Sequence, residues 1–214
     1  MRTKLMLAAV LTLALAGCED IQGDGIIVEQ ERPAGVFSGV SLSEGLHGEV
    51  SVGPQASVKI RGDSNLLEYI RLELRDGVLT SELDGGYGLF PSEPIVVTII
   101  TPTLKELRAL NGTHLSASGI DTTGFSLTVG GRSQVKAAGS AEKLTLMASG
   151  DSDVQAGELA VEVAQIDVSG SSDVRLHVTH QITGTASTGS NVIVQGNPPQ
   201  SDIATSGGSQ VLFE

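Results

Sequence analysis

The sequence predicts an all-β protein: a parallel β-helix-like β-solenoid with coils of about nineteen residues, preceded by further β strands. Three observations point to this fold. The 214 residues include 27 glycines, no tryptophan and only 3% aromatic residues, which favours an aliphatic β core with frequent turns. A Gly/Ser-rich turn recurs six times at a nearly constant period. Apolar and polar residues alternate on both sides of this turn, which is the two-residue period of a strand.

Residues 1–17 have the pattern of a lipoprotein signal peptide. Arg2 and Lys4 supply a positive start, and the apolar run that follows is too short to remain as a membrane span. The tetrapeptide LAGC, residues 15–18, resembles the lipobox of bacterial lipoproteins, and Cys18 is the only cysteine in the chain. That resemblance implies cleavage before Cys18 and acylation of its thiol, so that the mature protein is anchored in a membrane without spanning it. Several acyl chains, at about 0.8 kcal/mol per buried methylene, hold a protein far more firmly than one. The alternative is an ordinary secretory signal with an accidental cysteine.

The mature chain is acidic. Removal of the signal leaves 11 basic against 25 acidic side chains, a formal net charge of −14. Such a surface repels polyanions, which argues against nucleic acid as a partner and against a second, electrostatic contact with anionic lipid headgroups. With Cys18 acylated, no disulfide is left to stabilise the fold, so the apolar core must suffice.

The segment of residues 18–35 is short, polar and rich in turn residues, and we expect it to be a lipidated tether. From Ile26 onward, apolar runs that are broken by turn residues predict strands. These runs are GIIVEQ (25–30), VFSGVSL (36–42), GEVSVG (48–53), ASVKIRG (56–62), IRLELRDGVLTSEL (70–83) and PIVVTIITP (94–102).

Two local signals stand out within this stretch. Asp76 and Gly77 lie between two alternating runs and predict a two-residue hairpin turn. DSNLLEYI, residues 63–70, is the one helical suggestion, with Asp63 or Ser64 as the cap of a single turn.

The repeated turn defines the second half of the chain. Its copies include SGDSDV (149–154) and SGSSDV (169–174). The turn glycines are Gly112, Gly131, Gly150, Gly170, Gly189 and Gly207, at spacings of 19, 19, 20, 19 and 18 residues. Stacked coils explain why the same turn returns at the same phase, because equivalent corners lie above one another in a solenoid. We therefore expect Gly150 and Gly170 to occupy equivalent corners with positive φ, where Ser or Asp side chains bond to the neighbouring backbone.

Two features depart from a regular repeat, and the C-terminal strand adds a third observation. Alignment on the glycine leaves the copies at Gly112 and Gly189 one residue short after the turn. It also places Thr185 and Ser187 at inward positions, which predicts a polar patch in the core. The terminal QVLFE carries Val211 and Phe213 into the last strand, an edge through which copies of the chain could associate.

The order of these motifs after a lipobox resembles a bacterial family of unknown function, the putative auto-transporter adhesin head GIN domain. The resemblance extends from Val36 to the C-terminus, so we expect a GIN-like β-solenoid domain over residues 36–214, with the repeats over residues 107–214. It implies an extracytoplasmic β-helical protein that is often lipid-anchored and adhesin-like by analogy. It supplies no catalytic residues, and a fold alone does not define a function.

The candidates for chemistry are few. Asp151, Asp153 and Asp173 lie in stacked turns and could bind Ca²⁺ through oxygen ligands, but the period does not match the nine-residue calcium repeat, and Asx turns explain them better. His177 and His180 are three apart, which on a strand places the rings on opposite faces and argues against a metal site. Asn111-Gly112-Thr113 matches a glycosylation sequon but is better interpreted as a turn. We therefore assign no catalytic, cofactor-binding or metal-binding residue and expect no cofactor.

Three classes of function stay open. We favour a non-enzymatic, lipid-anchored envelope protein that binds an unidentified protein or glycan, adhesin-like or structural. A β-helical polysaccharide lyase or hydrolase is the second class, and the third is a ligand- or ion-binding envelope sensor. The expected place is the extracytoplasmic side of the bacterial envelope, at the outer membrane on its periplasmic or surface face.

Overall fold

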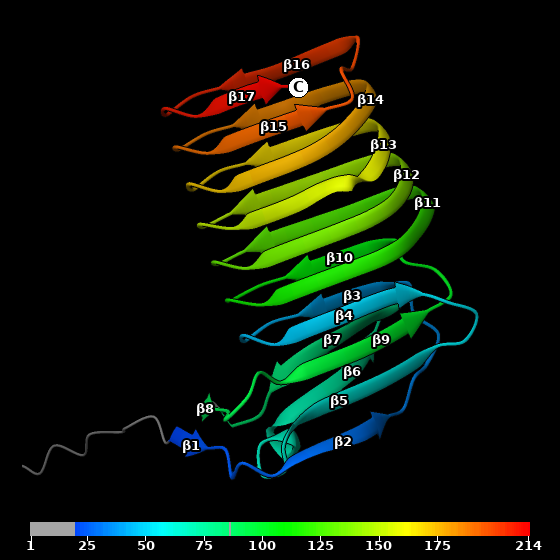
Figure 1. Ribbon diagram of the computed structural model, residues 1–214, viewed down its shortest axis with the longest axis vertical. Coiled ribbons are helices and arrows are strands. Elements are labelled where there is room, and N and C mark those ends of the chain that lie inside the picture. The colour runs from blue at the N-terminus through cyan, green and yellow to red at the C-terminus, as the bar shows by residue number, and fades with distance from the viewer. Residues whose placement is uncertain (1–19, 86) are drawn as a thin grey trace, which may run out of the picture.

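The computed structural model describes residues 20–85 and 87–214, and within them the predicted fold class is confirmed. One 15-stranded sheet winds into a β-solenoid of about five turns, with further strands before it. Figure 1 shows the C-terminal coils stacked at one end and the N-terminal strands at the other. The expected signal peptide and Cys18 lie outside the described residues. The elements are β1 (Asp20–Gln22), β2 (Ile27–Arg32), β3 (Gly39–Leu42), β4 (His47–Val52), β5 (Ser57–Asp63), η1 (Leu67–Tyr69), β6 (Ile70–Arg75), β7 (Val78–Leu83), β8 (Gly88–Phe90), β9 (Val96–Thr101), β10 (Glu106–Ala109), β11 (His114–Gly130), β12 (Gln134–Ser149), β13 (Asp153–Val168), β14 (Asp173–Ala186), β15 (Asn191–Gln195), β16 (Gln200–Thr205) and β17 (Gln210–Phe213).

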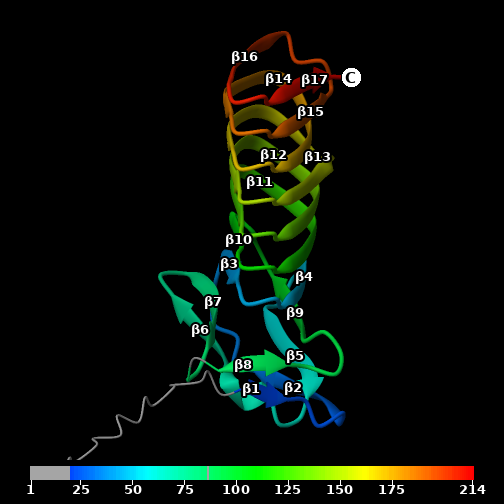
Figure 2. The same ribbon diagram turned by 90° about the vertical axis from the view of Figure 1, so that its left-hand side faces the viewer.

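Four long strands, β11 to β14, each make up most of one coil. Each strand runs along one side of the solenoid, bends near its middle and returns along the other side, so that the coil has two walls joined by a tight turn (Figure 2). The first wall contains β9, β4, the first halves of β11 to β14, β15 and β17. The second wall contains β7, β3, β10, the second halves of β11 to β14, and β16. All of the pairs along these two walls are parallel, which is the pairing that stacked coils require.

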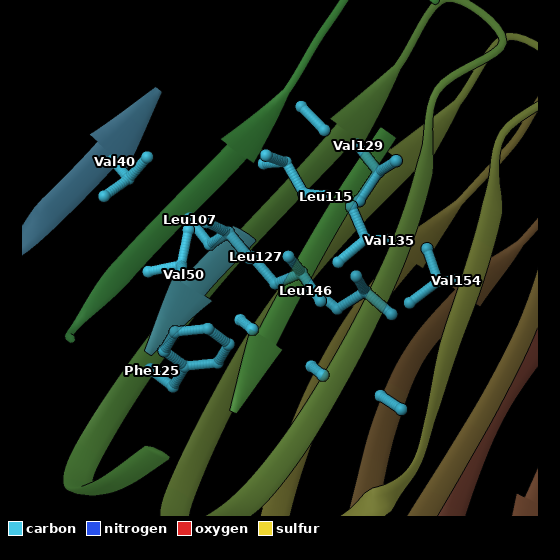
Figure 3. Packing of buried hydrophobic residues seen from close by; sticks show 14 of the residues in the cluster. Val40, Val50, Leu107, Leu115, Phe125, Leu127, Val129, Val135, Leu146 and Val154 are labelled. Atoms are coloured by element: carbon cyan, nitrogen blue, oxygen red, sulfur yellow. The ribbon is translucent and has the colours of Figure 1, made fainter. Parts of the chain in front are cut away.

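The core lies between the two walls and is built from stacked aliphatic side chains. On the second wall Leu146 lies between Leu127 below and Ile166 above, and all three are at most 2% exposed. On the first wall Val135 and Val154 are paired in the same way. Figure 3 shows Leu127, Leu146, Val135 and Val154 directed into the space between the walls. The narrow interior is filled by Val, Leu, Ile and Ala, which accounts for the small number of aromatic residues in the sequence.

The recurring turn is a tight corner with two consecutive residues of positive φ. Gly150 has φ of 69° and Asp151 has 59°, while one coil later Gly170 has 65° and Ser171 has 58°. Two such residues in succession turn the chain sharply from one wall to the other, and glycine adopts this φ without the steric cost that a side chain brings. The prediction that Gly150 and Gly170 occupy equivalent corners with special backbone angles is confirmed.

A buried serine follows the two positive-φ residues and joins successive corners. The Ser172 Oγ donates to the Ser169 carbonyl at 2.8 Å and accepts from the Ser152 backbone N–H, one coil below, at 3.2 Å. Ser133 and Ser190 occupy the same position and donate to the carbonyl three residues before them. The expected bond from a turn side chain to a neighbouring backbone is thus confirmed for the serines. The aspartates instead accept from side chains: Asp153 from Gln155, and Asp173 from Asn191.

Replacing Ser172 with Ala is expected to lower the free energy of unfolding by about 1 to 3 kcal/mol, because a buried N–H of Ser152 and a carbonyl of Ser169 lose their partner. The neighbouring Ser171 is exposed, so Ser171→Ala serves as the matched control and should change stability by less than about 0.5 kcal/mol. Urea unfolding followed by circular dichroism measures both. Equal midpoints for the two variants would show that the serine bonds contribute nothing beyond the turn.

The structure corrects the alignment on the turn glycine. At the corners of Gly112 and Gly189 the glycine is the second positive-φ residue, after Asn111 and Thr188, whereas at Gly150 it is the first. Those two copies are therefore not one residue short; they are aligned when the buried Ser or Thr is taken as the reference position. With this reference position, the residues expected to point into the core before Gly112 and Gly189 change by one place.

The predicted polar patch of Thr185 and Ser187 is consequently wrong. Ala186 is fully buried beside Val168, and Thr185 is exposed on the outer surface, where its hydroxyl donates to the Asp167 carboxylate at 2.8 Å. The core of that coil is therefore as apolar as that of its neighbours.

The N-terminal strands close the base of the solenoid. β3 pairs with β10 on the second wall, and β4 pairs with β11 on the first, so both strands continue the stack. Below them the pairing changes: β5 is antiparallel to β2 and β9, and β6 and β7 form the predicted hairpin around Asp76 and Gly77. Residues 20–32, inside the expected tether, form β1 and β2, and β1 pairs with β8. The ordered fold thus begins before Val36.

The expected single helical turn is present as η1, but neither Asp63 nor Ser64 caps it with a side chain. The Asp63 carboxylate instead accepts hydrogen bonds from the backbone N–H groups of Gly25 and Ser92, both at 2.8 Å, and from the Ser92 hydroxyl at 2.6 Å. Asp63 is inaccessible to solvent and thereby joins the N-terminal segment, β5 and the loop before β9.

Candidate functional site

The outer surface of the first wall carries polar side chains in straight rows. Parallel in-register pairing places equivalent outward residues of successive strands side by side, about 4.8 Å apart. The row nearest the tight turns contains Val96, His47, His114, Gln134, Asp153, Asp173, Asn191 and Gln210. The next row along the strands contains Thr98, Glu49, Ser116, Lys136, Gln155, Arg175, Ile193 and Leu212.

Hydrogen bonds within these rows hold the side chains in place. The Asn191 amide donates to Asp173 at 2.9 Å across two coils, and the Gln155 amide donates to Asp153 at 3.2 Å between the rows. The first wall therefore presents a flat, ordered array of donors and acceptors whose spacing is set by the backbone.

The lower part of this wall is hollowed around two histidines. His47 of β4 and His114 of β11 are register partners, and their ring centroids are 4.7 Å apart with the planes inclined by 34°. A groove of about 230 Å³ lies here and continues upward along the wall, with Glu49, Lys136 and Asp153 among its lining residues. Sixty-seven residues separate the histidines in the sequence, and only the parallel pairing of β4 with β11 brings them together.

Burial, and to a lesser extent the His114 imidazole, lower the pKa of His47 below its ordinary value of 6.5. The unfolded chain therefore takes up this proton more readily than the folded chain. The contribution of His47 to stability is complete above pH 6.5 and declines as the pH falls below that value towards the lower pKa of the folded state.

We expect His47→Gln to make the melting temperature less sensitive to acid than that of the wild type between about pH 7.5 and pH 5. Glu49, Lys136 and Asp153 face the same groove and stay unchanged in both proteins. Gln134→Asn, in the same row of the first wall, is the matched control, because it changes no titratable group, and its pH profile should follow the wild type. Parallel profiles for all three proteins would contradict a lowered pKa at His47.

A second hollow lies at the base of the solenoid, between the β6–β7 hairpin, the β3–β4 turn and the loop around β8. Its volume is about 310 Å³. Leu46, Ile70 and Ile95 are buried in its wall, while Glu44 and Glu82 supply carboxylates. It is a mostly apolar pocket with acidic groups among its lining.

Asp151, Asp153 and Asp173 lie at the corners of the stacked coils, as expected. Within residues 20–85 and 87–214 no group of three His, Cys, Asp or Glu side chains is close enough to hold a metal ion. Asn111 and Gly112 form a turn as expected, and Asn111 donates to Glu44 at 2.7 Å.

His177 and His180 do not lie on opposite faces. The alternation of buried and exposed residues shifts by one position between the buried Val178 and Ile182, so both imidazoles lie outside the core, and the predicted arrangement is wrong.

At the C-terminal coil Leu212 and Phe213 are 55% and 42% exposed. Association of copies through that edge stays a prediction. The described part of the chain contains no helix that is long and apolar enough to cross a membrane.

Comparison with known proteins gives one family and several similar folds. The family described as putative auto-transporter adhesin, head GIN domain, matches residues 36–198. A putative adhesin from Bacteroides fragilis has a similar structure, with a TM-score of 0.74 and 16% identity over 91% of this chain and all of that one. A putative adhesin from Parabacteroides merdae has a TM-score of 0.58 and 16% sequence identity, and the match covers 92% of this chain and 99% of that one. A putative lipid binding protein from Parabacteroides distasonis has a TM-score of 0.57 and 14% sequence identity, and the match covers 92% of this chain and all of that one. No curated protein sequence is significantly similar to this chain.

Proposed function

The chain belongs to the putative auto-transporter adhesin head GIN domain family, and from that premise we propose that it is a lipid-anchored, non-enzymatic binding module of the bacterial cell envelope. Its family and two of its structural neighbours are named as adhesins rather than as enzymes. The proposed mode of action is contact through the first wall, with a protein or glycan as partner.

The single observation that supports this mode most is the ordered polar array on the first wall. Binding without catalysis needs many weak contacts at fixed positions, and a rigid wall offers them with little loss of conformational freedom on binding. Amide and carboxylate groups repeat there at the strand spacing, so a partner with regularly placed hydroxyl or amide groups can bond to several coils at once.

The wall can be tested with one pair of double variants. In Gln134→Lys with Asp173→Lys, both changes lie on the first wall; in Thr145→Lys with Thr183→Lys, both lie on the outer surface of the second wall. We expect the first pair to abolish binding of the fluorescently labelled soluble chain to cells and envelope fractions of its own species, and the second pair to leave binding unchanged. Equal loss, or no loss, in both proteins would place the binding surface elsewhere.

The anchor is tested separately. Cys18→Ala should abolish labelling by a fatty acid and leave unprocessed precursor, because the acylated thiol is absent. Fatty-acid label that persists on the variant would contradict the proposed anchor.

The soluble chain should also be inactive in reducing-sugar and unsaturated-product assays. Turnover that disappears on replacement of one acidic side chain would favour the lyase or hydrolase alternative.

One observation favours a second candidate, the binding of a small apolar ligand at the base. The pocket of about 310 Å³ has buried aliphatic walls, and one structural neighbour is named as a putative lipid binding protein. Binding of a fluorescent fatty acid or aliphatic amine that is lost in Ile70→Glu, with native circular dichroism, would support this candidate. Because Glu44 and Glu82 line the pocket, the amine should bind more tightly than the acid.

A further inference from the structure

His47 and His114 form a pair whose geometry is unusual for solvated surface histidines. They come from adjacent parallel strands at the same register position, so the backbone holds their Cβ atoms side by side. The ring centroids are 4.7 Å apart, and both rings stand on the outer surface of the first wall. Both residues line the same groove, so the two imidazoles face one common space.

The nitrogen atoms of both rings are available for a ligand. Among residues 20–85 and 87–214, neither imidazole takes part in a hydrogen bond or an ion pair. His47 is half-buried, His114 is exposed, and both line the same groove, so a metal ion can reach the pair from solvent.

We propose that His47 and His114 together bind one divalent transition-metal ion, such as Zn²⁺ or Ni²⁺. Imidazole suits both ions, and ligand nitrogens lie about 2.0 to 2.1 Å from Zn²⁺, so two of them on one ion are at most about 4 Å apart. Rings whose centroids are 4.7 Å apart reach that separation by small side-chain rotations, without a change in the backbone.

The coordination shell has two protein ligands and open positions. No third His, Cys, Asp or Glu in the described residues is close enough to complete a metal group with them. Glu49 and Asp153 line the same groove and contribute two negative charges against the one positive charge of Lys136, so the charged groups of the groove favour a cation on balance. The open positions are filled by water in the free protein. They can also take a carboxylate or imidazole from a binding partner, an extension that rests on the proposed contact function of the first wall.

The four histidines of the chain supply both the test and its control. The mature chain of residues 18–214, made without lipid and with Cys18→Ser so that no thiol competes, contains every residue that the structure describes. Isothermal titration calorimetry with ZnCl₂ and NiCl₂ should show one equivalent bound. His47→Gln and His114→Gln should each weaken binding by at least about tenfold. The double variant His177→Gln with His180→Gln should bind as the parent does.

Nuclear magnetic resonance identifies the ligands directly. Nickel should broaden the imidazole signals of His47 and His114 and leave those of His177 and His180 sharp. Circular dichroism confirms that each variant is folded before titration. The proposal is overturned if neither metal binds to the folded parent, if binding survives both single substitutions, or if the His177 and His180 signals are the ones that broaden. Because the titration measures metal alone, its failure is distinct from a failure of the wall variants to lose cell binding.

Discussion

Replacing Gly184 with Ala is expected to destabilise the solenoid by about 4 kcal/mol or more. Gly184 lies in β14 beside Ile166 of the coil below, with φ of 141°, a conformation that residues with a side chain rarely adopt. A methyl group there would overlap the carbonyl oxygen of Ile166, which is backbone and cannot rotate away. The two coils must separate or β14 must change its path, and either change breaks ladder hydrogen bonds.

Gly124→Ala in β11 is the control, because Gly124 is also a strand glycine but is exposed, has no positive φ and has open space around the added methyl group. Its free energy of unfolding should stay within about 0.5 kcal/mol of the wild type. Gly139, with φ of 135° beside Ile120, repeats the geometry of Gly184 two coils below. Gly139→Ala should therefore be as damaging as Gly184→Ala. If urea unfolding gives Gly184→Ala and Gly124→Ala the same free energy of unfolding, the coils can separate at little cost.

The sequence predicts the repeat well because its signals are local. A turn with positive φ selects glycine, a buried strand selects alternating aliphatic residues, and both requirements return with every coil. At Gly189, however, the sequence did not show which of the preceding residues point into the core. Both positive-φ positions of the corner accept glycine, so one glycine does not reveal which position it occupies. The buried serine is the better marker, since Ser133, Ser152, Ser172 and Ser190 stand at one position throughout.

The site depends on contacts that the sequence does not encode locally. His47 and His114 meet because β4 enters the stack directly below β11, whereas the chain between them forms η1 and the antiparallel strands of the base. Alternation in a strand is the same for parallel and antiparallel pairing, so the change of pairing at β5 left no signal. HVTH drew attention to His177 and His180 because they are close in sequence, yet the strand bends between them. Residues that meet across coils are therefore identified by the register between strands and not by their distance in the sequence.

Replacing Leu146 with Ala is expected to lower the free energy of unfolding by about 2 to 5 kcal/mol. Leu146 is 1% exposed and lies between Leu127 and Ile166 in the inward stack of the second wall. Its removal leaves a void between two coils whose backbones are held by parallel hydrogen bonds, so the neighbouring side chains cannot move in to fill the space. The cost should therefore lie in the upper half of that range.

The next residue along the strand supplies the control. Met147 lies on the outer surface, 53% exposed, so Met147→Ala should change stability by less than about 0.5 kcal/mol. The two substitutions remove side chains of similar volume one residue apart. The difference between their free energies of unfolding therefore measures the effect of an inward against an outward side chain. Chemical denaturation of both variants measures it. Similar losses for Leu146→Ala and Met147→Ala would mean that the stack is loosely packed and that the walls, rather than the core between them, carry the stability of the coils.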